Sequence, residues 1–212
     1  MNKFTIDELS VKNALAPVFQ RVYPDSAIQT GWFGNKHALQ LGMKYHEPLG
    51  WKNSTALVEF NVARPYIYGH ANPNQSYTHM NQPLAHPLGA NFIEWVGMVM
   101  WQPKHRWHTS LQAIYSRKGY TNNLYNMGEN PAISNIDIVQ SNKIFGYTIT
   151  QGKRVDVANA RVEVGYTLVE NWNLRLESAV HYRWQRANTN VRDLAFFTMG
   201  IRTGLWNDYK NL

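Results

Sequence analysis

One segment of the chain, residues 64–92, gathers side chains that could contact a ligand. It contains three histidines and three tyrosines, but Arg64 is its only charged residue. Aromatic rings pack on the apolar faces of sugar rings, and amides and imidazoles hydrogen-bond to hydroxyl groups. The segment therefore predicts a glycan-contacting surface, and the candidates are Arg64, Tyr66, Tyr68, His70, Tyr77, His79, Asn81 and His86. The alternative is that these side chains only hold the segment folded.

The histidines of this segment could instead bind a transition metal, since neutral imidazole is a common ligand. Their spacings of nine and seven residues (His70, His79, His86) fit no helical or hairpin metal site, and no nearby carboxylate completes the set. The chain also contains no cysteine, which excludes thiolate sites and disulfides. We predict neither a metal nor any other cofactor.

Two carboxylates, Glu163 and Glu177, could form the acid and base pair of a glycosidase. Each has an arginine two residues before it on the same face, Arg161 and Arg175, so cross-strand ion pairs explain them more simply. The sequence contains no nucleophile elbow, phosphate loop or metalloprotease helix. The protein is therefore predicted not to be an enzyme.

The composition limits which elements can position these residues. The 212 residues suit a single domain over 1–212, and only 17% are charged, whereas about 25% is usual in soluble domains. The net charge of +7 comes from scattered Lys and Arg residues, which favours no nucleic-acid partner. The longest mostly apolar run, 92–101, contains Glu94 and falls far short of the roughly 20 residues of a membrane-spanning helix.

Apolar and polar residues alternate with a period of two along much of the chain, which indicates β-strands. The run 92–102 is apolar on both faces apart from Glu94, so the orientation of that strand stays open. About eight strands are predicted, near residues 4–11, 37–45, 56–62, 92–102, 107–116, 155–169, 174–185 and 192–206.

The connections between these strands alternate between short and long. Short links near 47–52, 103–106 and 170–172 alternate with long ones near 12–35, 69–91 and 119–154, and with an intermediate one at 187–190. This alternation is typical of an outer-membrane β-barrel. Five tryptophans fall at the short-turn end, where an interfacial aromatic belt would lie: Trp51, Trp101, Trp107, Trp172 and Trp206.

The predicted fold is thus all-β, an antiparallel meander transmembrane β-barrel of about eight strands or a sector of a larger barrel. Outer-membrane lipid and lipopolysaccharide would be its surroundings, with Arg117 and Lys118 facing headgroups at a strand end. The charged residues expected to face the lumen are Glu59, Arg161, Glu163, Arg175, Glu177 and Arg202. A soluble β-sandwich or lipocalin-like barrel is the alternative, because its strands also alternate.

Several stretches of the sequence resemble one family of outer-membrane proteins. These are "VARPYIYGH", "YTHMNQPLAHPLGANF", "FTIDELSV", "ALQLGMKY" and "FFTMGIRTGLWNDY". Together they resemble the barrels of Bacteroidetes proteins related to capsule-assembly Wzi and gliding-motility RemB. The resemblance implies an outer-membrane location and a part in surface polysaccharide assembly or attachment, or in gliding. Family members are longer, so the chain is expected to be a C-terminal portion, although it ends in Leu212 rather than an aromatic residue.

Two other functions remain open from the sequence. A general porin or small-solute channel would use the charged lumen residues for selectivity, and a soluble β-barrel would bind a small ligand.

Overall fold

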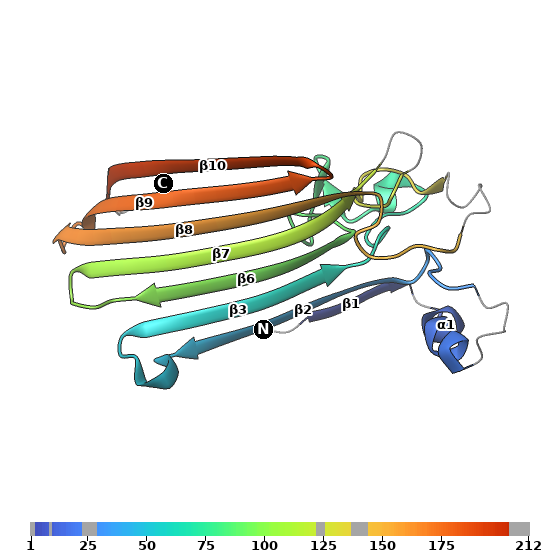
Figure 1. Ribbon diagram of the computed structural model, residues 1–212, viewed down its shortest axis with the longest axis horizontal. Coiled ribbons are helices and arrows are strands. Elements are labelled where there is room, and N and C mark those ends of the chain that lie inside the picture. Colours follow the sequence, from blue (N-terminus) through green and yellow to red (C-terminus); the bar gives the residue numbers. More distant parts are fainter. Residues whose placement is uncertain (1–2, 9, 23–28, 122–125, 137–143, 204–212) are drawn as a thin grey trace, which may run out of the picture.

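The computed structural model describes residues 3–8, 10–22, 29–121, 126–136 and 144–203. The fold is mostly antiparallel β, and a single sheet of eight strands dominates it (Figure 1). Its strands, in spatial order, are β1 (Lys3–Glu8), β2 (Lys36–His46), β3 (Ser54–Ala63), β6 (Phe92–Trp101), β7 (Trp107–Tyr120), β8 (Lys153–Val169), β9 (Leu174–Ala187) and β10 (Asn190–Arg202). Each strand pairs with the next one in this order, so the predicted meander is confirmed.

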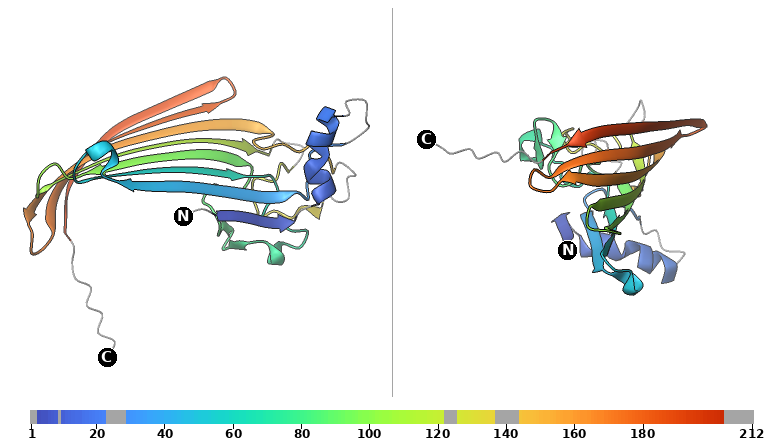
Figure 2. Two further views of the ribbon diagram at one scale, coloured as in Figure 1. Left: turned by 90° about the horizontal axis from the view of Figure 1, so that it is seen from below. Right: turned by 90° about the vertical axis from the view of Figure 1, so that its left-hand side faces the viewer.

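The sheet is open in the part of the chain that the structure describes. The strands β1 and β10 lie at its two edges and do not pair with each other. Figure 2 shows the strong twist of the sheet, which is the usual consequence of strand geometry. The described residues therefore form an eight-stranded meander, and its closure into a barrel, one form of the predicted fold, is not observed.

The strand register divides the sheet into two chemically different faces. On one face, Met43 of β2 lies opposite Val58 of β3, and Leu111 of β7 lies opposite Val162 of β8. We call this the apolar face, and it includes Phe4, Ile6, Leu39, Leu41, Met43, Val58, Phe60, Trp95, Leu111, Val162, Val180, Phe197 and Met199. The opposite side, the polar face, includes Gln40, Glu59, Asn61, Glu94, Gln112, Ser116, Arg161, Glu163, Glu177, Arg183 and Arg202.

The apolar face is uncovered, whereas the polar face is covered at one end. Met43 is 65% exposed and Phe197 63% exposed. The buried apolar cluster of the described residues lies where the connection 64–91 folds against the polar face, and it consists of Ala63, Ile67, Ala90 and Phe92. The register also settles the orientation of β6, because Glu94 lies between Asn61 and Ser116 on the polar face.

The connection 64–91, which we call the covering loop, contains short regular elements. They are the 3-10 helix η2 (Pro73–Gln75) and the strands β4 (Thr78–His79) and β5 (Gln82–Pro83). Met80 and Asn81 join β4 to β5 with φ angles of 49° and 60°. Two consecutive positive φ angles are the geometry of a type I′ hairpin turn, in which asparagine is favoured. A further 3-10 helix, η1 (Pro48–Gly50), lies in the short link between β2 and β3.

One helix, α1 (Val11–Val22), lies between β1 and β2, where the sequence predicted only a long connection. The carbonyl of Ser10 accepts a hydrogen bond from the Ala14 amide, and the Ser10 amide donates to Oδ1 of Asn35. These bonds fix the start of the helix next to the start of β2. No helix in the described residues is both long enough and apolar enough to cross a membrane.

Candidate functional site

A pocket of about 570 Å³ lies between the covering loop and the polar face, at the end of the sheet where the long connections gather. The sheet contributes side chains from its first strands, including Lys3 and Thr5 of β1 and Gln40 of β2. The loop contributes Tyr68, His70, Gln75, Tyr77, Leu84, Ala85 and His86. Four of the eight predicted glycan-contacting residues therefore line one cavity: Tyr68, His70, Tyr77 and His86.

Cationic side chains at the strand ends hold the connections in place. Lys36, the first residue of β2, donates from Nζ to the Gly69 carbonyl at 3.0 Å, and Lys118 of β7 donates to the carbonyl of Leu88. In both bonds the acceptor is a backbone carbonyl of the covering loop. The roof of the pocket is thus fastened to two strands of the sheet through its own main chain.

Arg64 fastens two further connections and does not line the pocket. Its Nη2 lies 3.4 Å from the carbonyl oxygen of Trp32 and 3.2 Å from that of Tyr147, and donates to both. Its Nε is buried and has no hydrogen-bond partner among the described residues. Burial lowers the pKa of the Arg64 guanidinium. These contacts assign Arg64 to holding the fold together.

Tyr66 is likewise a packing residue, since only 3% of it is exposed. Its hydroxyl donates to the carbonyl of Asn126 at 2.5 Å, and its ring meets Tyr147 edge to face with centroids 5.1 Å apart. Burial is the main cause that raises the pKa of the Tyr66 hydroxyl. Its φ of 64° is left-handed, and Gly128 packs so closely on it that a Cβ there would lie 2.5 Å from the Tyr66 nitrogen.

Tyr68 and Tyr77 form the aromatic wall of the pocket. Their ring centroids are 6.1 Å apart, and the Tyr77 amide donates to the Tyr68 carbonyl at 2.8 Å. Tyr77 is 55% exposed, so its ring is accessible from solvent. Beside them, the His70 amide is hydrogen-bonded to Oγ of Ser76, which leaves the His70 ring at the pocket wall. Accessible aromatic rings next to polar groups suit a ligand with both apolar and hydroxyl surfaces.

A chain of hydrogen bonds supports the pocket residues Asn61 and His86. Nδ2 of Asn61 donates to Oε1 of Glu59 at 2.8 Å and to Oε2 of Glu94 at 3.0 Å. His86 lies 3.0 Å from the same Glu94 oxygen and stacks on Phe92 at 4.5 Å between ring centroids. Because each member is engaged by its neighbour, this network is built to hold its shape.

His79 and Asn81 lie outside the pocket. His79 is an exposed residue of β4, and Asn81 occupies the hairpin turn that follows it. Asn81 has a positive φ, which asparagine tolerates better than most residues, so the turn itself explains why asparagine occurs at this position. Within the described ranges, no three histidine, aspartate or glutamate side chains gather closely enough to hold a metal ion.

All six charged residues that were expected to face a lumen share the polar face. Glu59 lies opposite Gly42, Arg161 opposite Gln112, and Arg175 opposite Arg202. Their pairing differs in part from the predicted cross-strand bridges. Arg161 pairs with Glu163 in its own strand, Glu177 approaches Arg202 of β10 at 3.8 Å, and Arg175 donates to Oδ1 of Asn173.

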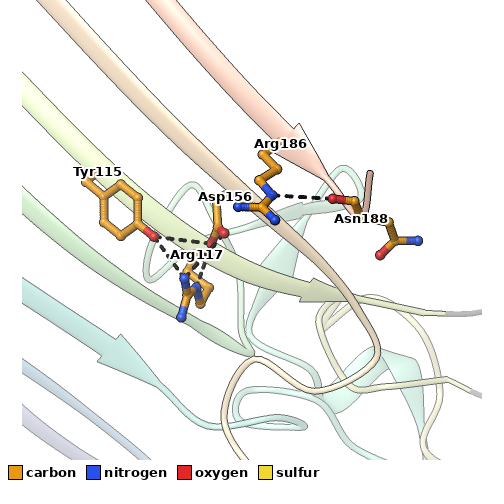
Figure 3. A network of polar contacts seen from close by, with 5 residues as sticks. All are labelled: Tyr115, Arg117, Asp156, Arg186 and Asn188. Atoms are coloured by element: carbon orange, nitrogen blue, oxygen red, sulfur yellow. Dashed lines mark hydrogen bonds and ion pairs between the residues drawn. The ribbon is translucent and has the colours of Figure 1, made fainter. Parts of the chain in front are cut away.

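The basic pair Arg117 and Lys118 is split between the two faces. Arg117 lies on the side of the apolar face, where its Nε is 2.6 Å from Oδ1 of Asp156 and its Nη2 donates to the Tyr115 hydroxyl (Figure 3). Arg186 of β9 lies opposite Asp156 in the register. Polar groups therefore replace apolar ones at this end of the apolar face. Lys118 lies on the other face, where it donates to the Leu88 carbonyl of the covering loop.

Sequence reasoning missed several residues of the pocket. Lys3, Thr5, Gln40 and Asn61 come from polar-face positions near the loop end of their strands. Glu94, which bonds to the lining residues Asn61 and His86, lies in the strand whose orientation was open. Alternation assigned Gln40 and Asn61 to a face, whereas the weak first strand, predicted near 4–11, gave no face for Lys3 or Thr5. Only the fold of the covering loop shows that this part of the polar face is covered.

No protein-family model, no curated protein sequence and no solved structure matches the chain. The resemblance to the Wzi-like and RemB-like barrels therefore stays a prediction.

Proposed function

We propose that the chain is part of an outer-membrane β-barrel that contacts surface polysaccharide through the pocket beneath its covering loop, without catalysing a reaction. The observation that carries the proposal is the contrast between the faces of one sheet. The apolar face is exposed along its length, and the polar face bears ion pairs and a roofed pocket. A soluble sheet buries its apolar face, whereas a membrane barrel turns it to lipid.

Aromatic rows at two levels of the apolar face support a membrane setting. Near the loop end, Phe60 lies opposite Trp95, and Trp95 opposite Tyr115, with Trp184 further along the same row. Near the short-turn end, the rings of Trp107 and Tyr166 are 5.1 Å apart and those of Trp51 and Trp101 5.3 Å apart. Aromatic girdles bound the apolar band of membrane barrels at both interfaces.

The distance between these rows suits a bilayer. Trp107 and Tyr115 are eight residues apart on β7, which corresponds to about 27 Å along the strand at roughly 3.4 Å per residue. Because barrel strands are tilted by about 35–45°, this length spans roughly 19–22 Å of membrane height, close to the apolar band of about 25 Å. Beyond the aromatic row near the loop end, the apolar face ends at the ion pair of Arg117 and Asp156.

The pocket supports polysaccharide as the ligand class. Tyr68 and Tyr77 offer rings for the apolar faces of sugars, and Gln40 and Gln75 offer amides for their hydroxyl groups. Tyr77, a residue of the pocket wall, is 55% exposed, so its ring is accessible to a ligand from solvent.

The membrane half of the proposal is tested on the purified chain. We expect detergent dependence and heat-modifiable migration on a gel, as for folded membrane barrels. A monodisperse monomer in detergent-free buffer would overturn it. Steady single-channel conductance in planar bilayers would favour the porin alternative, in which Arg161, Glu163, Arg175 and Glu177 set selectivity.

The ligand half is tested by a double variant, Tyr68→Ala with Tyr77→Ala. We expect less polysaccharide retained on cells that carry the variant, and weaker retardation of the purified protein in gels containing that polysaccharide. His79→Ala is the matched control, because it removes an exposed aromatic residue of the same loop outside the pocket. Equal retention by the double variant and the control would reject the pocket as the contact site.

A further inference from the structure

The helix α1 exposes its large apolar side chains, and its most buried described residue is the small Ala16. Ala16 is only 3% exposed and Asn13 is half-buried, and both lie on one side of the helix. The opposite side forms a stripe at helical spacing, which we call the apolar stripe: Leu15 (44% exposed), Val18 (57%), Phe19 (46%) and Val22 (62%). A helix on a water-soluble surface normally has the reverse orientation.

Two cations border the apolar stripe. At about 100° per residue, Lys12 falls just beyond Phe19 on one flank and Arg21 falls beyond Val18 on the other. Both are exposed. Cationic side chains at the borders of an apolar stripe can reach lipid phosphates while their stems cover apolar surface. This charge arrangement favours a lipid surface over a second apolar protein surface.

The position of the helix fits the same surface. In Figure 2 the axis of α1 runs across the direction of the strands, so strands that cross a membrane would leave the helix parallel to the membrane plane. Val11 follows the last residue of β1 by three positions, which limits their separation to about 10 Å. The apolar face extends almost to this strand end, since Ile6 of β1 is 48% exposed.

From these observations we infer that α1 is an interfacial helix, which lies in the leaflet at the loop end of the sheet with its apolar stripe among the lipid chains. The inference rests on the proposed membrane setting and adds a second lipid contact to it. The helix would then hold the edge strand β1 at a fixed depth, next to the pocket that Lys3 and Thr5 help to line.

The absence of cysteine from the sequence permits a clean labelling experiment. Single variants Val18→Cys (apolar stripe), Gln20→Cys (opposite side of α1) and Met43→Cys (apolar face of β2) are labelled with an environment-sensitive fluorophore. Each full chain is reconstituted into vesicles of phosphatidylethanolamine and phosphatidylglycerol, with or without nitroxide-bearing lipids. We expect blue-shifted emission and severalfold quenching at position 18, most strongly by a shallow nitroxide, and little quenching at position 20.

The three labels separate the failure of this inference from that of the proposed function. Quenching at position 43 without quenching at position 18 would overturn the interfacial helix and leave the membrane sheet standing. A blue shift at position 18 without lipid quenching would also overturn it, because a protein surface would then cover the stripe. Quenching at position 18 alone would support the helix and reject the membrane sheet.

Discussion

His86 and Glu94 join the covering loop to the sheet, with 3.0 Å between Nε2 and Oε2. The Leu88 amide donates to Nδ1 of the same ring, so neutral His86 carries its proton on Nε2 and donates to the carboxylate. One imidazole thereby closes a turn of the loop and bonds the loop to β6. The geometry of the pocket depends on this double use.

Replacing His86 with Ala should loosen the loop, because it removes both hydrogen bonds and leaves Glu94 with one partner fewer. A hydrogen bond to a charged group is worth about 1.5–3 kcal/mol, and the opening free energy of residues 64–91 should fall by about that much. Hydrogen exchange of these amides measures it. His79→Ala provides the baseline, and identical protection in the two variants would contradict a bonding role for His86.

Ile67 is fully buried in the cluster between the loop and the sheet, with Ala63, Ala90 and Phe92 around it. Ile67→Ala should destabilise the fold by about 2–5 kcal/mol, and Ile67→Val by about 0.5–1.5 kcal/mol. Denaturant unfolding of the two variants tests this order. If Ile67→Ala lowers the free energy of unfolding by less than about 0.5 kcal/mol, the loop is not packed as described.

Leu111 and Gln112 are neighbours in β7 that point to opposite faces of the sheet. If lipid covers the apolar face, Leu111→Arg should cost about 2–4 kcal/mol, as for a cation near the bilayer midplane. Gln112→Arg faces the polar side and should cost far less. Reversible folding into vesicles compares them, and equal costs for the two variants would argue against a lipid-facing surface.

Glu170, at the short-turn end, makes the stability of the fold depend on pH. Nε of Arg106 donates to its Oε1 at 3.0 Å, and this bond holds the pKa of Glu170 below its ordinary value of 4.5. A lowered carboxyl pKa stabilises the fold above the ordinary value, and the stabilisation is lost as the pH falls through the lowered pKa. The stability difference between the wild type and Glu170→Gln should therefore shrink on acidification. Unfolding curves measured from neutral to acidic pH test this. A stability difference between the two proteins that stays constant over this range would refute the coupling.

The strands were predictable because alternation is a local signal. All eight predicted segments overlap observed strands, although β7 continues to Tyr120, and Trp206 of the last segment lies outside the described residues. For β6 the signal failed on orientation, since both of its faces are mostly apolar. Pairing with β3 and β7 supplied that orientation, and pairing is a property of three strands together.

The helix α1 was missed although its spacing was readable. Leu15, Val18, Phe19 and Val22 recur at helical intervals, but Pro17 interrupts the run, and proline is expected to end helices. The β4–β5 hairpin lacks the usual Asn-Gly signal, because Met80 takes the first turn position.

The candidate site was predictable only as a list of residue types. Which tyrosines face the pocket depends on how the covering loop returns to the sheet, and that path depends on contacts between distant parts of the chain. Tyr66 and Tyr68 are the same residue type and lie two positions apart. The first is nevertheless buried against Tyr147, whereas the second lines the cavity. Composition and spacing cannot separate them.

The bonds from Lys36, Arg64 and Lys118 end on main-chain oxygens of Gly69, Tyr147 and Leu88. A carbonyl is present whatever side chain the acceptor residue carries. The outward-facing residues of these connections can therefore change in type while the anchors persist. In the proposed outer-membrane setting, this arrangement would let the exposed side chains of the loops vary while the scaffold stays unchanged.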